Sequence, residues 1–184
     1  VVRSSHHTED LMVNLVTNYE DDKTIDALSR HLMSEIEQIT TIVNNINDQP
    51  SPTAEGRFEK VIHGPGYIVD YIGPYRFQID ANAFFQTNTA QAQKLYDVAL
   101  EFANLNTEEV LYDLYCGVGT LGIYMSPQTK KVIGVESVDV AVENARQNAK
   151  DNEVENIEFI EGEMRDVFNP SFIEENGMPD CLIT

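Results

Sequence analysis

From residue 88 onward, strand patterns and helix patterns alternate along the chain, and this alternation limits the fold more than any other feature. Strands are predicted at residues 110–115, 131–136, 157–160 and 180–184, and helices at 89–104, 120–125, 138–151 and 165–175. Strands separated by helical segments of this length form βαβ units with a parallel sheet. We therefore predict an α/β fold, the first half of a doubly wound domain, truncated after its fourth strand.

The first 80 residues follow a different pattern, mostly strands with one helix. Strands are predicted at residues 11–17 and 40–47, with residues 1–3 pairing with the first of them, and a helix at 24–39 between the two. After a polar loop at 48–56, three short strands are separated by Gly64-Pro65-Gly66 and Gly73-Pro74, which indicates an antiparallel meander. We thus expect a smaller α+β domain at 1–80, followed by the α/β domain at 81–184.

Charge and composition argue against several classes of function. The chain has 12 Lys and Arg against 31 Asp and Glu, a net charge of −19, and a general polyanion binder needs clustered cations instead. No apolar run is long enough to span a membrane, and the N-terminal residues lack the pattern of a signal peptide. Cys116 and Cys181 match no metal-ligand spacing, so we expect a reduced, cytoplasmic chain without a metal or a membrane partner.

A glycine-rich turn lies between the strand at 110–115 and the helix at 120–125. Its sequence, Cys116-Gly117-Val118-Gly119-Thr120-Leu121-Gly122, contains the G-x-G-x-x-G pattern. The pattern alone fits NAD as well as other nucleotides, because glycines let the backbone approach a ligand at a helix N-terminus. A strand-rich domain and a helix precede this strand, whereas NAD-binding folds usually open with it.

Two acids near the turn favour a different cofactor. Asp113 lies at the carboxyl end of the first strand, where it would repel a pyrophosphate but could orient an ammonium group, such as the amine of S-adenosylmethionine. Glu136 ends the second strand, where a carboxylate can accept both ribose hydroxyls. Purely structural roles stay open: a tight turn for Gly117 and Gly119, a helix cap for Asp113 and a solvated strand end for Glu136. Glu163, after the third strand, could reach an adenine amino group or be an ordinary exposed acid.

Several motifs together resemble the RNA uracil-C5 methyltransferases, which use S-adenosylmethionine to modify uridines of ribosomal or transfer RNA. The matching segments are Asn82-Ala83-Phe84-Phe85-Gln86-Thr87-Asn88, Asp113-Leu114-Tyr115-Cys116-Gly117-Val118-Gly119-Thr120, Gly134-Val135-Glu136, Asn144-Ala145-Arg146-Gln147-Asn148-Ala149 and Pro179-Asp180-Cys181-Leu182-Ile183. They cover most of the chain. The Phe-Phe-Gln-x-Asn segment makes the resemblance specific, since a generic methyltransferase would not carry it.

The resemblance implies roles for individual residues. Gln86 would bind the cofactor close to the target base, Tyr115 would line the cofactor site, and Glu136 would hold the ribose. Glu163 would lie near the adenine, and Thr120 stands where some relatives have Asn. Phe84 would contact the substrate, where an aromatic ring stacks with a base or fills the gap left by a flipped one; the alternative is a core aromatic at the domain junction.

The chemistry of this family requires a cysteine thiolate, which adds to C6 of uracil, and a general base that removes the C5 proton after methyl transfer to give 5-methyluridine. In the family both lie beyond a segment that would begin where this chain stops. We therefore expect an internal fragment that carries the cofactor site but neither catalytic group, with Cys116 and Cys181 in structural roles. Some members bind an iron–sulfur cluster through upstream cysteines, and no such set occurs here.

The leading hypothesis is thus part of a cytoplasmic S-adenosylmethionine-dependent RNA methyltransferase, with ribosomal RNA expected ahead of transfer RNA as its partner. Residues 1–80 would contact RNA. Two alternatives remain: an NAD-binding oxidoreductase module, and a non-catalytic RNA-binding protein with a degenerate cofactor fold.

Overall fold

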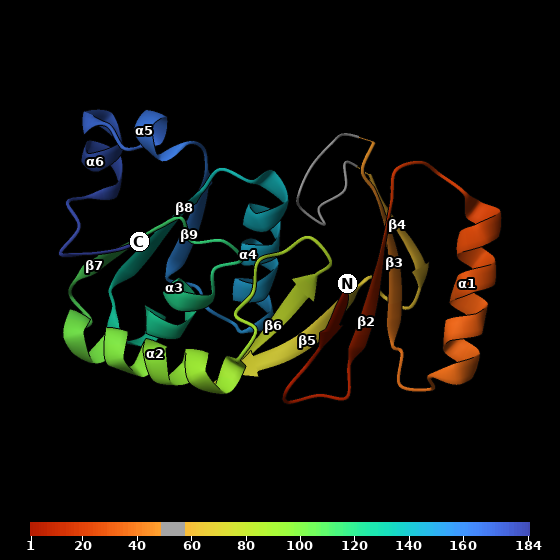
Figure 1. Ribbon diagram of the computed structural model, residues 1–184. Coiled ribbons are helices and arrows are strands. Elements are labelled where there is room, and N and C mark those ends of the chain that lie inside the picture. The colour runs from red at the N-terminus through yellow and green to blue at the C-terminus, as the bar shows by residue number, and fades with distance from the viewer. Residues whose placement is uncertain (49–57) are drawn as a thin grey trace. The chain divides into compact units, whose positions relative to one another are not determined.

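A computed structural model describes residues 1–48 and 58–184 (Figure 1). Nearly all of the polar loop predicted at 48–56 therefore lies outside the described residues. The contacts divide the chain into two units, the first made of Val1–Asp70 and Gln78–Ala83, the second of Tyr71–Phe77 and Phe84–Thr184. Within the described ranges, no helix has the length and apolar character needed to cross a membrane.

The first unit is built on a four-stranded sheet in the order β1-β2-β3-β4. Its strands are β1 (Val2–Ser4), β2 (Leu11–Thr17), β3 (Thr41–Ile46) and β4 (Phe58–His63). β1 is antiparallel to β2 as predicted, β2 and β3 are parallel, and β4 returns antiparallel to β3. Helix α1 (Asp22–Glu35) is the crossover between the two parallel strands (Figure 1).

Helix α1 is shorter than the pattern predicts. Asp21 caps its start by accepting the backbone N–H of Thr24 over 3.1 Å. The prediction that the helix reaches Ile39 is wrong, because the chain turns extended at Ile36. Ile39 still contributes to the core, but from the turn before β3, where it packs with Val13 and Ile42. Helical spacing of apolar residues thus continued past the end of the helix.

The predicted meander is also wrong in one pairing. β5 (Tyr67–Ile72) and β6 (Tyr75–Asp80) form a two-stranded sheet of their own, while β4 joins β3. The turn after β4 folds back onto the start of β3, where the Thr41 hydroxyl donates to the carbonyl of His63 and accepts the N–H of Gly66. The end of the β5–β6 pair that contains the turn packs in the core of the second unit through Ile72 and Phe77.

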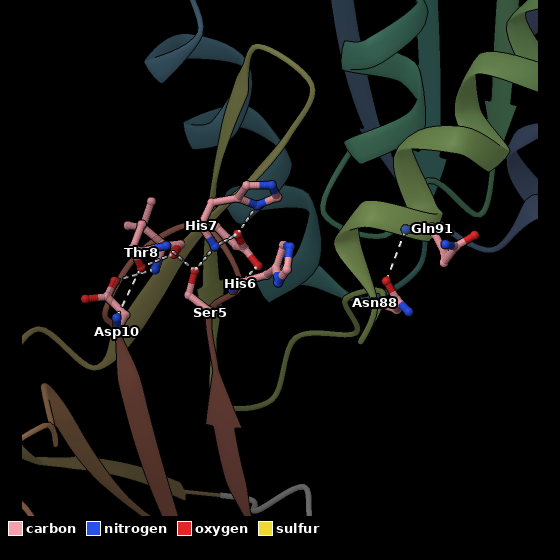
Figure 2. Close-up of polar contacts among 9 residues, drawn as sticks. Ser5, His6, His7, Thr8, Asp10, Asn88 and Gln91 are labelled. Carbon is pink, nitrogen blue, oxygen red and sulfur yellow. Dashed lines mark hydrogen bonds and ion pairs between the residues drawn. The ribbon is translucent and has the colours of Figure 1, made fainter.

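The turn between β1 and β2 is fastened to β5 by side-chain hydrogen bonds (Figure 2). The Asp70 carboxylate accepts the backbone N–H groups of His6 and His7, and it contacts Nδ1 of His7 at 2.8 Å. The Thr8 hydroxyl donates to the Val69 carbonyl over 2.9 Å. The turn between β1 and β2 therefore ties two distant parts of the first unit together.

The second unit confirms the predicted α/β fold. Its sheet has the order β10-β7-β8-β9, and all three pairings are parallel. The elements are α2 (Thr89–Ala103), β7 (Val110–Leu114), α3 (Thr120–Met125), β8 (Lys131–Glu136), α4 (Asp139–Asp151), β9 (Ile157–Glu161), α5 (Met164–Val167), α6 (Pro170–Asn176) and β10 (Cys181–Ile183). From β7 the sheet grows in one direction to β9, and β10 is then added on the other side of β7. Ligands of doubly wound sheets bind at the carboxyl ends of the strands beside such a switch point.

Helices cover both faces of this sheet (Figure 1). On one face, Leu111 and Val132 pack with Met125 at the end of α3. On the other, Tyr112 and Ile133 pack with Phe172 of α6. Successive strand residues thus point to opposite layers, which explains why the strands read as continuous apolar runs.

The single helix predicted at residues 165–175 is two short helices. The first ends at Val167, and Asn169 caps the second, since its side chain accepts the N–H of Phe172 over 3.1 Å. Pro170 occupies the first turn of α6, where its missing N–H costs nothing but would break a continuing helix. The pair Asn169-Pro170 in the sequence indicates this break.

Candidate functional site

The glycine turn connects β7 to α3, and its two leading glycines have different surroundings. Both have left-handed backbones, with φ of 54° at Gly117 and 80° at Gly119. A Cβ at Gly117 would meet no atom within 4 Å, whereas one at Gly119 would lie 2.7 Å from Cζ of Phe159. Gly119 is therefore needed for packing inside the protein. Gly117 leaves the backbone open to an approaching ligand.

Asp113 is the penultimate residue of β7 and is only 5% exposed. Its Oδ2 accepts the backbone N–H of Gly122 over 3.0 Å, so the third glycine of the motif brings α3 close to the strand. Burial, together with the nearby charge of Glu136, raises the pKa of this carboxyl to about 7, although the Gly122 bond opposes the rise. The contact observed is the helix cap that sequence reasoning left open. A contact with a ligand amine stays a prediction.

Glu136, the last residue of β8, is held by three backbone N–H groups. Its Oε2 accepts from Gly117 over 3.0 Å, and its Oε1 accepts from Ser137 over 2.8 Å and from Val138 over 3.0 Å. The structure thus joins the glycine turn to the predicted ribose-binding acid. Sequence reasoning missed the two donors that precede α4, although a residue directly before a helix is a known place for free N–H groups.

Tyr115 and Thr120, on either side of the turn, differ in exposure and in hydrogen bonding. Tyr115 has a φ of 71°, unusual for a residue other than glycine, and its side chain is 65% exposed. The hydroxyl of Thr120 shares a 2.8 Å hydrogen bond with the Tyr96 hydroxyl of α2. Thr120 therefore links two helices here, while the ring of Tyr115 is open to solvent. A backbone held in a costly conformation is typical of functional sites.

The remaining predicted residues are all exposed. Phe84 is 76% exposed, and Gln86 is exposed two residues later. Phe85 lies between them and points inward, with its ring centroid 6.0 Å from that of Phe77. Glu163 occupies the N-cap position of α5 just after β9, and its side chain makes no capping hydrogen bond. That strand pairs in register with β8, so the chain after it and Glu136 lie at the same edge of the sheet.

Neither cysteine has the properties of a nucleophile. Cys116 is buried in the core of the second unit, and this burial, with the charges of Asp113 and Glu136, raises the pKa of its thiol. Burial also raises the pKa of Cys181 on β10, with a further contribution from Glu109. A thiolate is the reactive form, so both environments disfavour attack.

Taken together, the carboxyl edge of this sheet presents an open backbone at Gly117 and an anchored carboxylate at Glu136. Such a site suits a ligand with a hydroxylated sugar. The carboxylates at 113, 136 and 163 disfavour a polyphosphate. Among residues 1–48 and 58–184, no group of three or more His, Cys, Asp or Glu side chains is placed to hold a metal ion.

Comparison with known proteins finds a matching family and several relatives. The family model for tRNA (uracil-5-)-methyltransferases matches residues 68–167. A protein of Oceanobacillus iheyensis, described as an uncharacterized RNA methyltransferase, is 37% identical over 183 residues, and a Clostridium acetobutylicum protein described in the same way is 39% identical over 183 residues. Each match covers 100% of this chain and 40% of the relative.

A solved structure agrees with the sequence comparisons. The Pyrococcus abyssi tRNA (uracil-54, C5)-methyltransferase, in complex with S-adenosyl-L-homocysteine, has a TM-score of 0.77 and 27% identity, covering 100% of this chain and 41% of that one. The chain thus spans about 40% of the length of the curated relatives it matches. Because the family model matches more than half of its residues, this chain belongs to the tRNA (uracil-5-)-methyltransferase family.

Proposed function

We propose that the protein containing this chain transfers a methyl group from S-adenosylmethionine to C5 of a uridine in RNA, and that this chain carries the cofactor site. The observation that carries the proposal is the hydrogen bond from Gly117 to Glu136 beside an open Cβ position. Family membership and the S-adenosyl-L-homocysteine bound to the Pyrococcus abyssi enzyme support this choice of cofactor.

The roles of the residues follow from their places at the sheet edge. Glu136 accepts a ribose hydroxyl on the Oε2 lone pair that its three backbone donors leave available. Asp113 attracts the amine, since its carboxyl has a raised pKa that a nearby ammonium lowers. Tyr115 packs against the bound cofactor beside the turn, with Thr120 at the start of α3. Glu163 approaches the adenine amino group, and Gln86 contacts the cofactor from the segment before α2.

The bound cofactor supplies an electrophilic methyl on a sulfonium centre. C5 of uracil is a weak nucleophile, so the reaction requires a thiolate at C6 and a base for the C5 proton. The raised pKa values of Cys116 and Cys181 make neither a suitable nucleophile. We therefore propose that these 184 residues bind the cofactor without turnover. Phe84, exposed at the start of the segment, stacks with a base of the RNA.

Which RNA is modified is a finer question. The Pyrococcus abyssi relative is named for a tRNA uridine, whereas the sequence analysis expects ribosomal RNA first. We propose RNA uridine as the substrate class. A competition between a transfer RNA transcript and ribosomal RNA fragments for binding to the chain would test the preference for ribosomal RNA.

The cofactor proposal is tested by calorimetric titration with S-adenosylhomocysteine and, separately, with NADH. We expect S-adenosylhomocysteine to bind and NADH to give no heat. Glu136→Gln removes a charged acceptor and should weaken binding at least about tenfold. Glu161→Gln is the matched control, because Glu161 ends β9 in register with Glu136 but is exposed. Binding of NADH alone, or equal effects of the two variants, would overturn the proposal.

The proposal that the chain has no turnover has its own test. The purified chain is incubated with radiolabelled S-adenosylmethionine and uridine-containing RNA, and nucleosides are then separated. We expect no 5-methyluridine. Its formation would contradict the assignment of structural roles to Cys116 and Cys181, which the variants Cys116→Ser and Cys181→Ser would then distinguish.

A further inference from the structure

Two asparagines in the first unit lie where a sheet core ordinarily carries apolar side chains. Asn45 on β3 is 0% exposed and Asn14 on β2 is 2% exposed. Burying an amide is costly unless its hydrogen bonds are made inside the protein. Here Nδ2 of Asn45 donates to Oδ1 of Asn14 over 3.0 Å, and Oδ1 of Asn45 accepts from Nδ2 of Asn82 over 3.0 Å. Three amides thus form a chain of hydrogen bonds, the amide chain, that ends on Asn82.

Asn82 and the next residue are held from two further strands. Nδ2 of Asn82 also donates to Oε2 of Glu59 on β4 over 3.1 Å. Arg3 on β1 donates through Nη1 to the carbonyl of Ala83 over 2.7 Å. Burial lowers the pKa of the Arg3 guanidinium, so a cation is partly withdrawn from water to hold one backbone oxygen. Anchors from β1, β3 and β4 therefore converge on two consecutive residues, and Asn14 of β2 supports them through Asn45.

The chain that follows these anchors carries residues of the proposed site. From Ala83 to Asn88 it is neither helix nor strand. Phe84 and Gln86 are exposed, and the next fixed points are the inward ring of Phe85 and the cap of α2, where Asn88 accepts the N–H of Gln91 over 3.1 Å (Figure 2). The segment has no strand or helix hydrogen bonds of its own. Its start is therefore fixed by the hydrogen bonds of Asn82 and Ala83.

We propose that Arg3, Asn14 and Asn45 are positioning residues, which fix the direction in which the chain leaves Ala83 and enters the segment that carries Phe84 and Gln86. The inference rests on the function proposed above for that segment. Apolar side chains of similar size at positions 14 and 45 would fill a core equally well. A chain of buried hydrogen bonds, in contrast, fixes the direction and register of the residue at its end.

A double-mutant cycle separates positioning from general stability. Asn45→Val removes the central amide and should weaken S-adenosylhomocysteine binding about fivefold, within the range of coupling seen for residues in one network. Combined with Gln86→Ala, it should cause no further loss, because its effect acts through Gln86. The matched control is Asn44→Val, the neighbour on β3, which is 2% exposed but donates to Leu15 and Thr17. Equal losses for the two variants, or additive losses with Gln86→Ala, would overturn the inference.

A second readout needs no cofactor. The chain has no tryptophan, so Phe84→Trp introduces a single indole at the start of the segment. Adding Asn45→Val should lower the fluorescence anisotropy of that indole, and adding Asn44→Val should leave it unchanged. An unchanged anisotropy in both would refute the anchoring. If Gln86→Ala does not alter cofactor binding, the proposed role of Gln86 fails, while the fluorescence still decides the anchoring.

A third variant covers the case in which Asn45→Val does not fold. Arg3→Met removes the donor to the Ala83 carbonyl and enters the same two measurements, with Arg3→Lys as the conservative variant expected to restore part of both signals. Restoration by Lys supports a role for the donor. Equal behaviour of Met and Lys in folded protein would count against it.

Discussion

The backbone N–H of Gly117 donates to Oε2 of Glu136 over 3.0 Å, while Oε1 of the same carboxylate accepts from Ser137 and Val138. The acid is therefore oriented by the backbone of the protein itself, and its orientation is tied to the glycine turn that a ligand would approach. Preorganisation of this kind reduces the ordering cost of binding. The same hydrogen bonds contribute to the stability of the fold.

The first prediction concerns that stability. Glu136→Gln replaces one acceptor oxygen by an amide that faces backbone donors, so at least one N–H loses its partner. We expect the free energy of unfolding to fall by about 1 kcal/mol. Urea denaturation followed by circular dichroism measures it. Glu161→Gln, at an exposed strand end, should stay within about 0.5 kcal/mol of the unchanged chain, and a similar loss there would show that the N–H network is not the cause.

The second prediction separates the two leading glycines. Gly119→Ala places a methyl 2.7 Å from Phe159 and 3.1 Å from Ala145 at a φ of 80°, so we expect a loss of about 2–4 kcal/mol in unfolding free energy. Gly117→Ala meets no protein atom and carries only backbone strain, about 1 kcal/mol. Its methyl instead occupies the space left for the ligand.

Thermal unfolding and S-adenosylhomocysteine titration of both glycine variants check this contrast. Gly117→Ala should bind weakly while remaining folded at room temperature, and Gly119→Ala should be destabilised first. A Gly117→Ala variant with unchanged affinity would show that the ligand does not approach the turn at this position.

The parallel sheet could be predicted because each of its strands and helices has a pattern within a short stretch of sequence. The strands at Val110–Leu114 and Lys131–Glu136 are apolar runs bounded by helices, and that alternation leaves few topologies. The place of the glycine turn and of Glu136 at the carboxyl edge follows from the same rule. The pairing of β4 with β3 could not be predicted in this way. Gly64-Pro65-Gly66 predicts that the chain reverses, but not which strand pairs with β4.

What the sequence could not show depends on contacts between distant residues. Asn14 and Asn45 look like solvent-facing polar positions in their strands, and only their pairing across β2 and β3 makes them part of a buried chain of amides. The hydrogen bonds from Ser137 and Val138 to Glu136 join residues that are close in sequence, yet their geometry depends on where α4 begins. The backbone strain at Tyr115 has no sequence signal, because tyrosine rarely adopts that conformation.

The third prediction uses this strain. At a φ of 71°, Tyr115 can be replaced by Asn at little cost, since Asn tolerates the left-handed region, whereas Val cannot relieve its crowding there. Tyr115→Val should be less stable than Tyr115→Asn by about 1 kcal/mol in urea unfolding. The exposed ring contributes little packing in either case. Equal stabilities would mean that the backbone at 115 is not left-handed in solution.

The fourth prediction concerns the effect of the raised pKa of Asp113 on the stability of the protein. Burial, with the charge of Glu136, raises this pKa from 3.8 to about 7 in the folded chain. Between these values the unfolded chain has released the proton that the folded chain retains, so the contribution of Asp113 to stability falls as pH rises from about 4 to about 7 and is level above. The difference in unfolding free energy between the unchanged chain and Asp113→Asn should follow this curve. A difference independent of pH would mean that Asp113 titrates normally in the fold.

The same carboxyl gives a prediction for binding. A ligand ammonium near Asp113 favours its ionised form, so the affinity for S-adenosylhomocysteine should rise with pH and level off above about 7, the folded-state pKa. Binding at pH 6 should therefore release a proton, which calorimetry detects as a dependence of the binding heat on the ionisation enthalpy of the buffer. Asp113→Asn should bind more weakly at pH 8 and show no such release. Proton release that persists in Asp113→Asn would assign it to another group, and the amine contact at Asp113 would have to be abandoned.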